Sequence, residues 1–218
     1  MNRVTRKISF VTVMLFFVHG CAGMMPPKYQ SVTEGPVSEV TFVAPAGSVR
    51  LRSGNRVEIS GYADYSIYRC RTVNWDNMQG YVEVRAKENP SQTVNVRAGE
   101  PVLLRVIVDA TEQPKPERYT TNITHLRVIG TMYLSFLPEE GEKYLVHTVF
   151  HEKFDSGKQP KNISEWKAYP DDYSLHVVVD KEDRQTRLRK RVDVQRPSFT
   201  GLGIRHSPHV VDGWPECS

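Results

Sequence analysis

The chain has 218 residues, of which 39% are apolar and 25% are charged. These fractions are typical of globular proteins, so the composition excludes a disordered chain, a fibrous repeat and a multi-span membrane protein. The formal net charge is +4, but residues 1–20 contribute three cations and no acid. The remaining 26 basic and 25 acidic groups leave a net charge of +1, which argues against a globally basic nucleic-acid-binding protein.

The N-terminus has the pattern of a secretory signal peptide. Its first seven residues contain Arg3, Arg6 and Lys7, and an apolar run of 11 residues follows, Ile8–Val18. A transmembrane helix needs about 20 apolar residues, so this run is too short to cross a bilayer. A short basic head and a short apolar body are typical of a signal peptide. We therefore predict that residues 1–20 are removed from the mature protein.

The residues at the end of the apolar run, Val18-His19-Gly20-Cys21, resemble the lipobox of bacterial lipoproteins. In that motif an aliphatic residue lies three places before a cysteine, and a small residue directly precedes the cysteine. The resemblance implies a diacylglycerol group on the Cys21 thiol, cleavage between Gly20 and Cys21, and acylation of the new amino terminus. Several acyl chains anchor a protein stably in the lipid bilayer, because each buried methylene contributes about 0.8 kcal/mol.

The resemblance also implies a location. An Asp directly after the lipidated cysteine commonly retains such a protein at the inner membrane, and Ala22 stands there instead. We therefore expect the outer membrane, with the domain facing the periplasm. The alternative is a plain secretory signal that is cut near Ala22 or Gly23. Residues 22–37 contain three prolines and no sustained period, so we predict a flexible tether of 16 residues with a reach of about 20–25 Å.

From Ser38 onward, short segments rich in β-branched residues alternate with turns that contain Gly or Pro. The best helical candidate, Ile163–Ala168, is only one or two turns long. The pattern predicts an all-β fold over residues 38–196, an antiparallel two-sheet β-sandwich of immunoglobulin-like or jelly-roll-like type. Residues 197–218 are expected to form a tail. The predicted strands are Glu39–Val43, Val49–Arg52, Arg56–Ser60, Ser66–Val73, Gly80–Lys87, Thr93–Arg97, Pro101–Asp109, Thr131–Leu137, Lys143–Phe150, Tyr173–Asp180 and Leu188–Val194.

The chain contains three cysteines. If Cys21 is lipidated, Cys70 and Cys217 remain, and an even number fits an oxidising compartment. We predict a disulfide between these two residues, which would fasten the C-terminal tail to the domain and stabilise it by about 3–5 kcal/mol. The alternative is two separate thiols that never meet.

Three histidines lie in predicted strands, His147, His151 and His176, and Asp180 has the same parity as His176. If the two strands pair, these side chains share one face, and such a set suits zinc or copper. Residues four apart along a strand are about 13 Å apart, so solvent-facing histidines are the favoured interpretation. A second window, His206-Ser207-Pro208-His209, is too short a pattern to indicate a metal site by itself.

A basic run occupies Lys181–Arg196, with seven cations and three acids. Its centre contains Arg187, Arg189, Lys190 and Arg191, which are candidate contacts for an anionic lipid, a glycolipid or another envelope protein of acidic character. The alternative is a solvated edge strand whose charges prevent edge-to-edge aggregation.

An aromatic stretch contains Tyr62, Tyr65, Tyr68 and Trp75. Aromatic rings can stack on sugars. Tyrosine is also common in strands for packing reasons alone, and that is the favoured interpretation.

The sequence carries no recognisable enzyme signature and none that indicates a cofactor. Ser164-Glu165-Trp166-Lys167 fits S-x-x-K, but the companion motifs S-D-N and K-T-G are missing. Leu134–Tyr144 is similar to a strand-turn-strand phrase of small, uncharacterised β-rich envelope lipoproteins, and it implies no activity. We therefore expect a non-enzymatic, membrane-anchored lipoprotein that acts in binding or envelope assembly, with no nucleic-acid partner. The alternatives are a metal-binding periplasmic lipoprotein that uses its histidines, and an enzyme without a recognisable motif.

Overall fold

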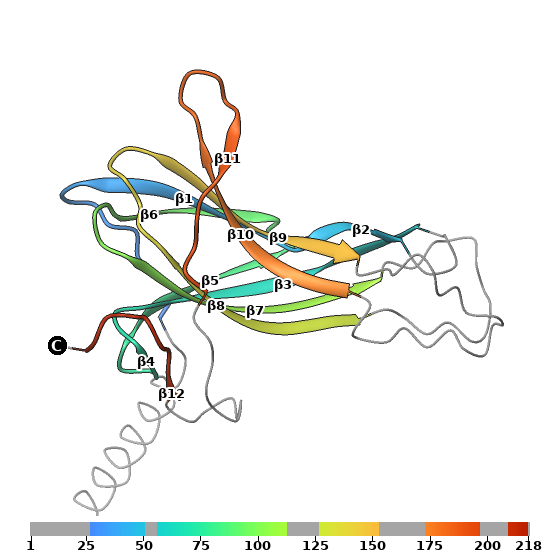
Figure 1. Cartoon of the computed structure of the whole chain (residues 1–218), viewed down its shortest axis with the longest axis horizontal. Coiled ribbons are helices and arrows are strands. Elements are labelled where there is room, and N and C mark those ends of the chain that lie inside the picture. The colour runs from blue at the N-terminus through green and yellow to red at the C-terminus, as the bar shows by residue number, and fades with distance from the viewer. Residues whose placement is uncertain (1–26, 51–55, 113–126, 153–172, 197–208, 218) are drawn as a thin grey trace, which may run out of the picture.

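The computed structural model describes residues 27–50, 56–112, 127–152, 173–196 and 209–217. Within these ranges the chain forms strands and no helix, and ten strands build two five-stranded sheets with a common core (Figure 1). The prediction of an all-β, two-sheet sandwich is confirmed. The helical candidate Ile163–Ala168 lies outside the described residues, as do the signal peptide and Cys21.

The first sheet has the order β11-β10-β9-β1-β6. One pair departs from the expected antiparallel pattern, because β1 and β9 run parallel, with Val40 beside Tyr144. Alternation along a strand specifies which face is buried, but it does not specify which strand lies alongside. The strands of this sheet are β1 (Val37–Val43), β6 (Ser91–Arg97), β9 (Lys143–Glu152), β10 (Tyr173–Glu182) and β11 (Arg189–Arg191).

The second sheet has the order β2-β3-β7-β8, and β5 also pairs with β3. The long strand β3 joins the predicted strand Arg56–Ser60 to the first part of Ser66–Val73. Its first half pairs with β2 and its second half with β5, so the predicted break is a change of partner. Gly61 lies at this change, where a Cβ atom would be 2.0 Å from the Asp109 carbonyl oxygen. The strands are β2 (Ala46–Arg50), β3 (Arg56–Tyr68), β5 (Met78–Arg85), β7 (Val102–Glu112) and β8 (Arg127–Phe136).

The core lies between the sheets and takes alternate residues from each strand. Phe42 of β1 packs against Tyr65 of β3 with 4.7 Å between ring centroids. The Tyr65 hydroxyl donates a hydrogen bond of 2.8 Å to the Val43 carbonyl, so this ring is fully buried without an unpaired polar group. Each large apolar side chain buried in this way contributes about 1.5–3 kcal/mol. Further core members from both sheets are Val40, Val84, Val96, Leu104, Val106, Leu134, Val146 and Val179.

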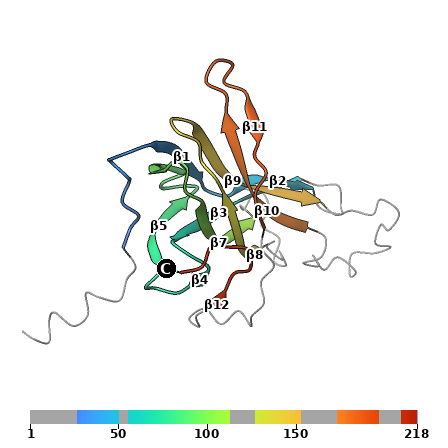
Figure 2. The ribbon, with the colours of Figure 1, turned by 60° about the vertical axis from the view of Figure 1, so that its left-hand side comes forward.

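The N-terminal segment, residues 27–36, is docked along the sandwich and shortens the predicted tether of residues 22–37. The Tyr29 amide donates to the Tyr81 carbonyl, and the Tyr81 amide donates to Pro27. Further along, the Val32 amide donates to Asn95 of β6. The segment therefore covers an edge strand of each sheet. An edge strand that is left uncovered can pair with another molecule. In Figures 1 and 2 it is the blue chain that runs from β1 down towards β5.

The C-terminal cap, residues 209–217, is also packed on the domain. It begins with β12 (His209–Val210), which pairs with β4 (Thr72–Val73). Trp214 is 4% exposed and covers a second apolar cluster, with 6.3 Å to the ring of Tyr68 and 6.0 Å to the ring of Tyr133. This part of the predicted tail therefore belongs to the folded body.

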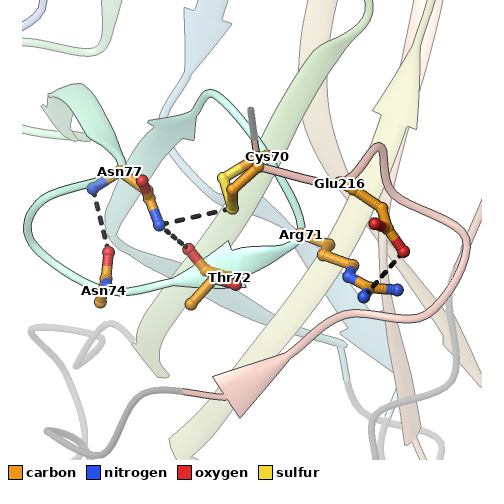
Figure 3. Close-up of a disulfide and its surroundings, with 7 residues drawn as sticks. Cys70, Arg71, Thr72, Asn74, Asn77 and Glu216 are labelled. Atoms are coloured by element: carbon orange, nitrogen blue, oxygen red, sulfur yellow. Dashed lines mark hydrogen bonds and ion pairs between the residues drawn. A yellow bond between two sulfur atoms is a disulfide. The ribbon is translucent and has the colours of Figure 1, made fainter.

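A disulfide joins Cys70 and Cys217, as predicted, with 5.0 Å between the Cα atoms (Figure 3). Beside it, Arg71 and Glu216 form an ion pair of 2.9 Å, and the Arg71 amide donates to the Pro215 carbonyl. The bond closes a loop with a sequence separation of 147 residues. It therefore ties the end of the C-terminal cap to the connection that follows β3.

Candidate functional site

The candidate site is the basic hairpin, residues 180–191, which includes the end of β10, a turn and β11. The strands pair antiparallel, with Asp180 opposite Arg191 and Glu182 opposite Arg189. The Asp183 carboxylate accepts hydrogen bonds from the amides of Gln185 and Thr186 at 2.9 and 2.7 Å, which holds the turn. The hairpin projects from the body at the top of Figure 1.

Asp180 is the buried centre at the base of this hairpin. It is 8% exposed, and its two carboxylate oxygens take different partners. His147 Nε2 lies 2.7 Å from one oxygen, and Arg191 Nε donates to the other at 2.6 Å. Burial opposes ionisation of Asp180, but the hydrogen bonds from His147 and Arg191 outweigh it and hold the pKa of the carboxyl below its usual value. Arg191 is therefore a partner of a buried carboxylate.

Other cations of the basic run are matched by acids of the same chain. Arg187 pairs with Glu182 at 2.7 Å, and Lys181 pairs with Glu139 at 2.9 Å. Arg184 contacts Glu142 at 3.5 Å. Arg187 and Arg191, two of the predicted contacts for an anionic partner, are thus each paired with a carboxylate of the hairpin itself.

Arg189 and Lys190 differ from their neighbours. All of β11 is exposed, and neither side chain has an acidic partner among the residues that the structure describes. Leu188, directly before them, is 70% exposed and is the most exposed large apolar residue of the described chain. Two cations without an acidic partner in the described chain and one exposed apolar side chain are therefore adjacent in the projecting hairpin.

His147 and His176 share a face as the parity predicts, but the described residues do not form a metal site. In the β9–β10 register, Val178 lies opposite His147 and Val149 opposite His176. His176 Nδ1 is 3.2 Å from an Arg196 guanidinium nitrogen, so this ring nitrogen already has a hydrogen-bond partner. No group of three His, Cys, Asp or Glu side chains suited to a metal occurs in the described part of the chain. His151 lies in β9, and its side chain is outside the described residues.

The remaining sequence candidates are dispersed. His206 lies outside the described residues, and His209 begins β12. Tyr65 is fully buried in the core, whereas Tyr68 lies under Trp214. The four aromatic residues of the predicted stretch therefore do not form one platform, and only Trp75 is largely exposed, at 54%.

A cavity of about 320 Å³ was not predicted from the sequence. The N-terminal segment forms one wall with Tyr29, and burial raises the pKa of that phenol, while Arg97 opposes and Glu100 reinforces the shift. Arg97 Nε lies 3.6 Å from Glu100, so these two charges of the lining are paired. The lack of any sustained period in residues 22–37 predicts a tether, and a tether would not form the wall of a cavity. Its lining also includes Gln30, Val32, Ile67, Arg69, Gln79, Val96, Pro101 and Val102.

The comparisons with known proteins give no relative. No protein family matches this chain, and neither a curated protein nor a solved structure is significantly similar to it. Within the described ranges, no helix is long and apolar enough to cross a membrane. The function is therefore argued from the residues of the chain alone.

Proposed function

We propose that this protein is a non-enzymatic lipoprotein, anchored through an acylated Cys21 in the bacterial outer membrane, that binds an acidic partner with its basic hairpin. The observation that carries the binding proposal is the exposure of Leu188, Arg189 and Lys190 at the start of β11. Among the described residues, no acid pairs with either of these two cations. Surface charges left unmatched within a chain are available to a partner of opposite charge.

Two features of the chain support the anchoring proposal. The lipobox-like residues Val18–Cys21 directly follow a signal-peptide pattern. The Cys70–Cys217 disulfide fits an oxidising compartment such as the periplasm. Metabolic labelling with radioactive palmitate tests the anchor, and we expect label in the native protein and none in Cys21→Ser. An unlabelled native protein, with an unmodified Cys21 by mass spectrometry, would contradict lipidation.

The rigidity of the hairpin supports a role in recognition. Beyond β11, the chain is fixed to β8, where the amides of Gln195 and Ser135 each donate to the other's carbonyl at 3.0 Å. Together with the Asp180–Arg191 contact, this fixes the C-terminal end of β11. The Asp183 amide, which donates to the Leu188 carbonyl at 2.8 Å, fixes the chain just before the strand begins. A side chain presented on a fixed backbone loses less conformational entropy on binding than one on a mobile loop.

The test is charge reversal at the two unmatched cations. A photo-crosslinking residue in place of Leu188 identifies the contact in intact envelopes. The affinity of the purified partner is then measured for Arg189→Glu/Lys190→Glu. At about 1 kcal/mol for each near-surface charge, we expect binding to weaken about ten-fold or more.

The matched control reverses two exposed lysines outside the hairpin, Lys28→Glu/Lys87→Glu. This double variant has the same net charge as the hairpin variant. Equal loss of affinity in the two double variants would show a general charge effect and contradict the hairpin assignment. An unchanged affinity in Arg189→Glu/Lys190→Glu would contradict it as well.

A further inference from the structure

The loop between β4 and β5 presents an exposed tryptophan on a fastened backbone. Trp75 has 54% of its surface exposed. Asn74 Oδ1 accepts a hydrogen bond of 2.9 Å from the Asn77 amide, and Asn77 Nδ2 donates to the Thr72 carbonyl at 3.1 Å (Figure 3). The same Nδ2 lies 3.6 Å from Cys217 Sγ of the disulfide. The exposed Trp75 ring therefore lies in a loop that is held by hydrogen bonds and by the neighbouring disulfide.

This loop lies next to the point at which the chain leads back towards Cys21. The Met78 amide donates to the Trp75 carbonyl, and three residues further along β5 the Tyr81 amide donates to Pro27. Three residues of a strand span about 10 Å, so Trp75 and Pro27 lie at the same end of the sandwich. Val210 of β12, which pairs with Thr72, is 42% exposed and adds a second apolar side chain there.

The distance from this end to the lipid anchor is short. Five residues, 22–26, separate Cys21 from Pro27. Six residue steps of at most about 3.6 Å limit the reach to about 20 Å. A lipidated Cys21 would thus hold the Trp75 end of the body close to the lipid headgroups.

Resting on the lipidation proposed above, we infer that the Trp75 end of the sandwich lies on the surface of the anchoring bilayer, with Trp75 in the headgroup region. Tryptophan favours this region because its ring is apolar while its N–H remains hydrogen-bonded. Charge does not drive the contact, since residues 27–30, 69–77 and 209–217 contain three cations and three anions. The contact is therefore expected to persist at high salt.

This orientation limits what the basic hairpin can bind. In Figures 1 and 2 the hairpin turn lies at the top of the molecule, while β4 and β12 lie at the bottom. With the Trp75 end on the bilayer, the hairpin lies on the side of the body away from the lipids that anchor Cys21. The acidic partner of the hairpin is then a molecule outside the anchoring bilayer.

The test places the lipidated full-length mature protein in phosphatidylethanolamine–phosphatidylglycerol vesicles, with and without brominated acyl chains that quench tryptophan emission. We expect native protein to lose emission in brominated vesicles and Trp75→Phe to lose clearly less. Trp166 and Trp214 remain in both proteins and give the same background. Equal quenching of the two proteins would overturn the inference.

A matched variant, Trp75→Phe/Leu188→Trp, moves the reporter to the hairpin. We expect no more quenching than in Trp75→Phe alone, and additional quenching would overturn the inference by placing the hairpin at the lipid. Vesicle flotation separates this result from the anchor itself. If the protein does not float, it lacks the anchor, and both the lipidation of Cys21 and the orientation are overturned. If it floats but Trp75 is not quenched, only the proposed orientation of the Trp75 end on the bilayer is overturned.

Discussion

The basic hairpin and the C-terminal cap are both additions to the sandwich, and they are held by opposite kinds of interaction. The cap is fastened by the Cys70–Cys217 bond and by Trp214, which is buried between aromatic rings. The hairpin is fastened by charge, with Asp180 between His147 and Arg191 at its base. The cap should therefore respond to reductant and to loss of apolar volume, and the hairpin to pH and to loss of charge.

The largest expected loss of stability follows removal of the disulfide. Cys70→Ser/Cys217→Ser removes a cross-link over a sequence separation of 147 residues, and long loops gain most from closure. We expect the free energy of unfolding, measured by urea denaturation, to fall by about 3–5 kcal/mol. Dithiothreitol should lower the stability of the native protein by a similar amount and leave the double variant unaffected. A native protein insensitive to reductant would show that the bond contributes little.

The next effect tests the aromatic part of the cap. Trp214→Ala leaves a cavity beside Tyr68 and Tyr133, and we expect it to cost about 3 kcal/mol in the same measurement. Trp214→Phe keeps most of the volume and should cost less. If the alanine variant is as stable as the phenylalanine variant, the ring is not a structural support of the cap.

A smaller effect is expected at the base of the hairpin. Asp180→Asn removes the charged acceptor of Arg191, and we expect a loss of about 1–3 kcal/mol near neutral pH. The lowered folded-state pKa of Asp180 means that its ionisation stabilises the fold above the unfolded-state pKa of about 4. That contribution is lost as the pH falls through the lower folded-state pKa.

Denaturation of both proteins between pH 7 and pH 3 checks the sign of this effect. The stability difference between native protein and Asp180→Asn should be largest near neutral pH and should shrink as the carboxyl is protonated. Glu58→Gln, at an exposed carboxylate, serves as the control. A difference that grows towards low pH would contradict a lowered pKa at Asp180.

The contrast between the two regions also shows what the sequence can predict. Alternation of apolar residues located the strands, and the parity of His147 and Asp180 placed them correctly on one face once β9 and β10 paired. The pairing of Arg187 with Glu182 depends on the shape of the turn, where Arg187 adopts a φ of 60°, and no periodicity reports that. Internal charge matching was therefore visible only in three dimensions.

The two ends of the described chain differ from the predicted tether and tail for a related reason. Residues 27–36 have no alternation because they bind strand edges mainly through backbone groups, as Tyr29 does with Tyr81. The C-terminal cap offered a signal in Trp214 and Cys217, since a large aromatic residue and a paired cysteine near a chain end indicate a docked segment. The parallel β1–β9 contact had no signal, because the core-facing residues would suit either direction.

The smallest expected effect separates charges that hold the hairpin from charges that face solvent. Arg189→Gln/Lys190→Gln should change the free energy of unfolding by no more than about 0.5 kcal/mol, because neither side chain has an acidic partner in the described chain. Arg191→Ala, which differs by one position, should cost about 1–3 kcal/mol, because the carboxylate of Asp180 stays buried with one partner fewer. Urea denaturation of both variants decides the matter. If the double neutral variant destabilises the fold as much as Arg191→Ala does, the two cations serve the fold, and their exposure would no longer argue for a partner.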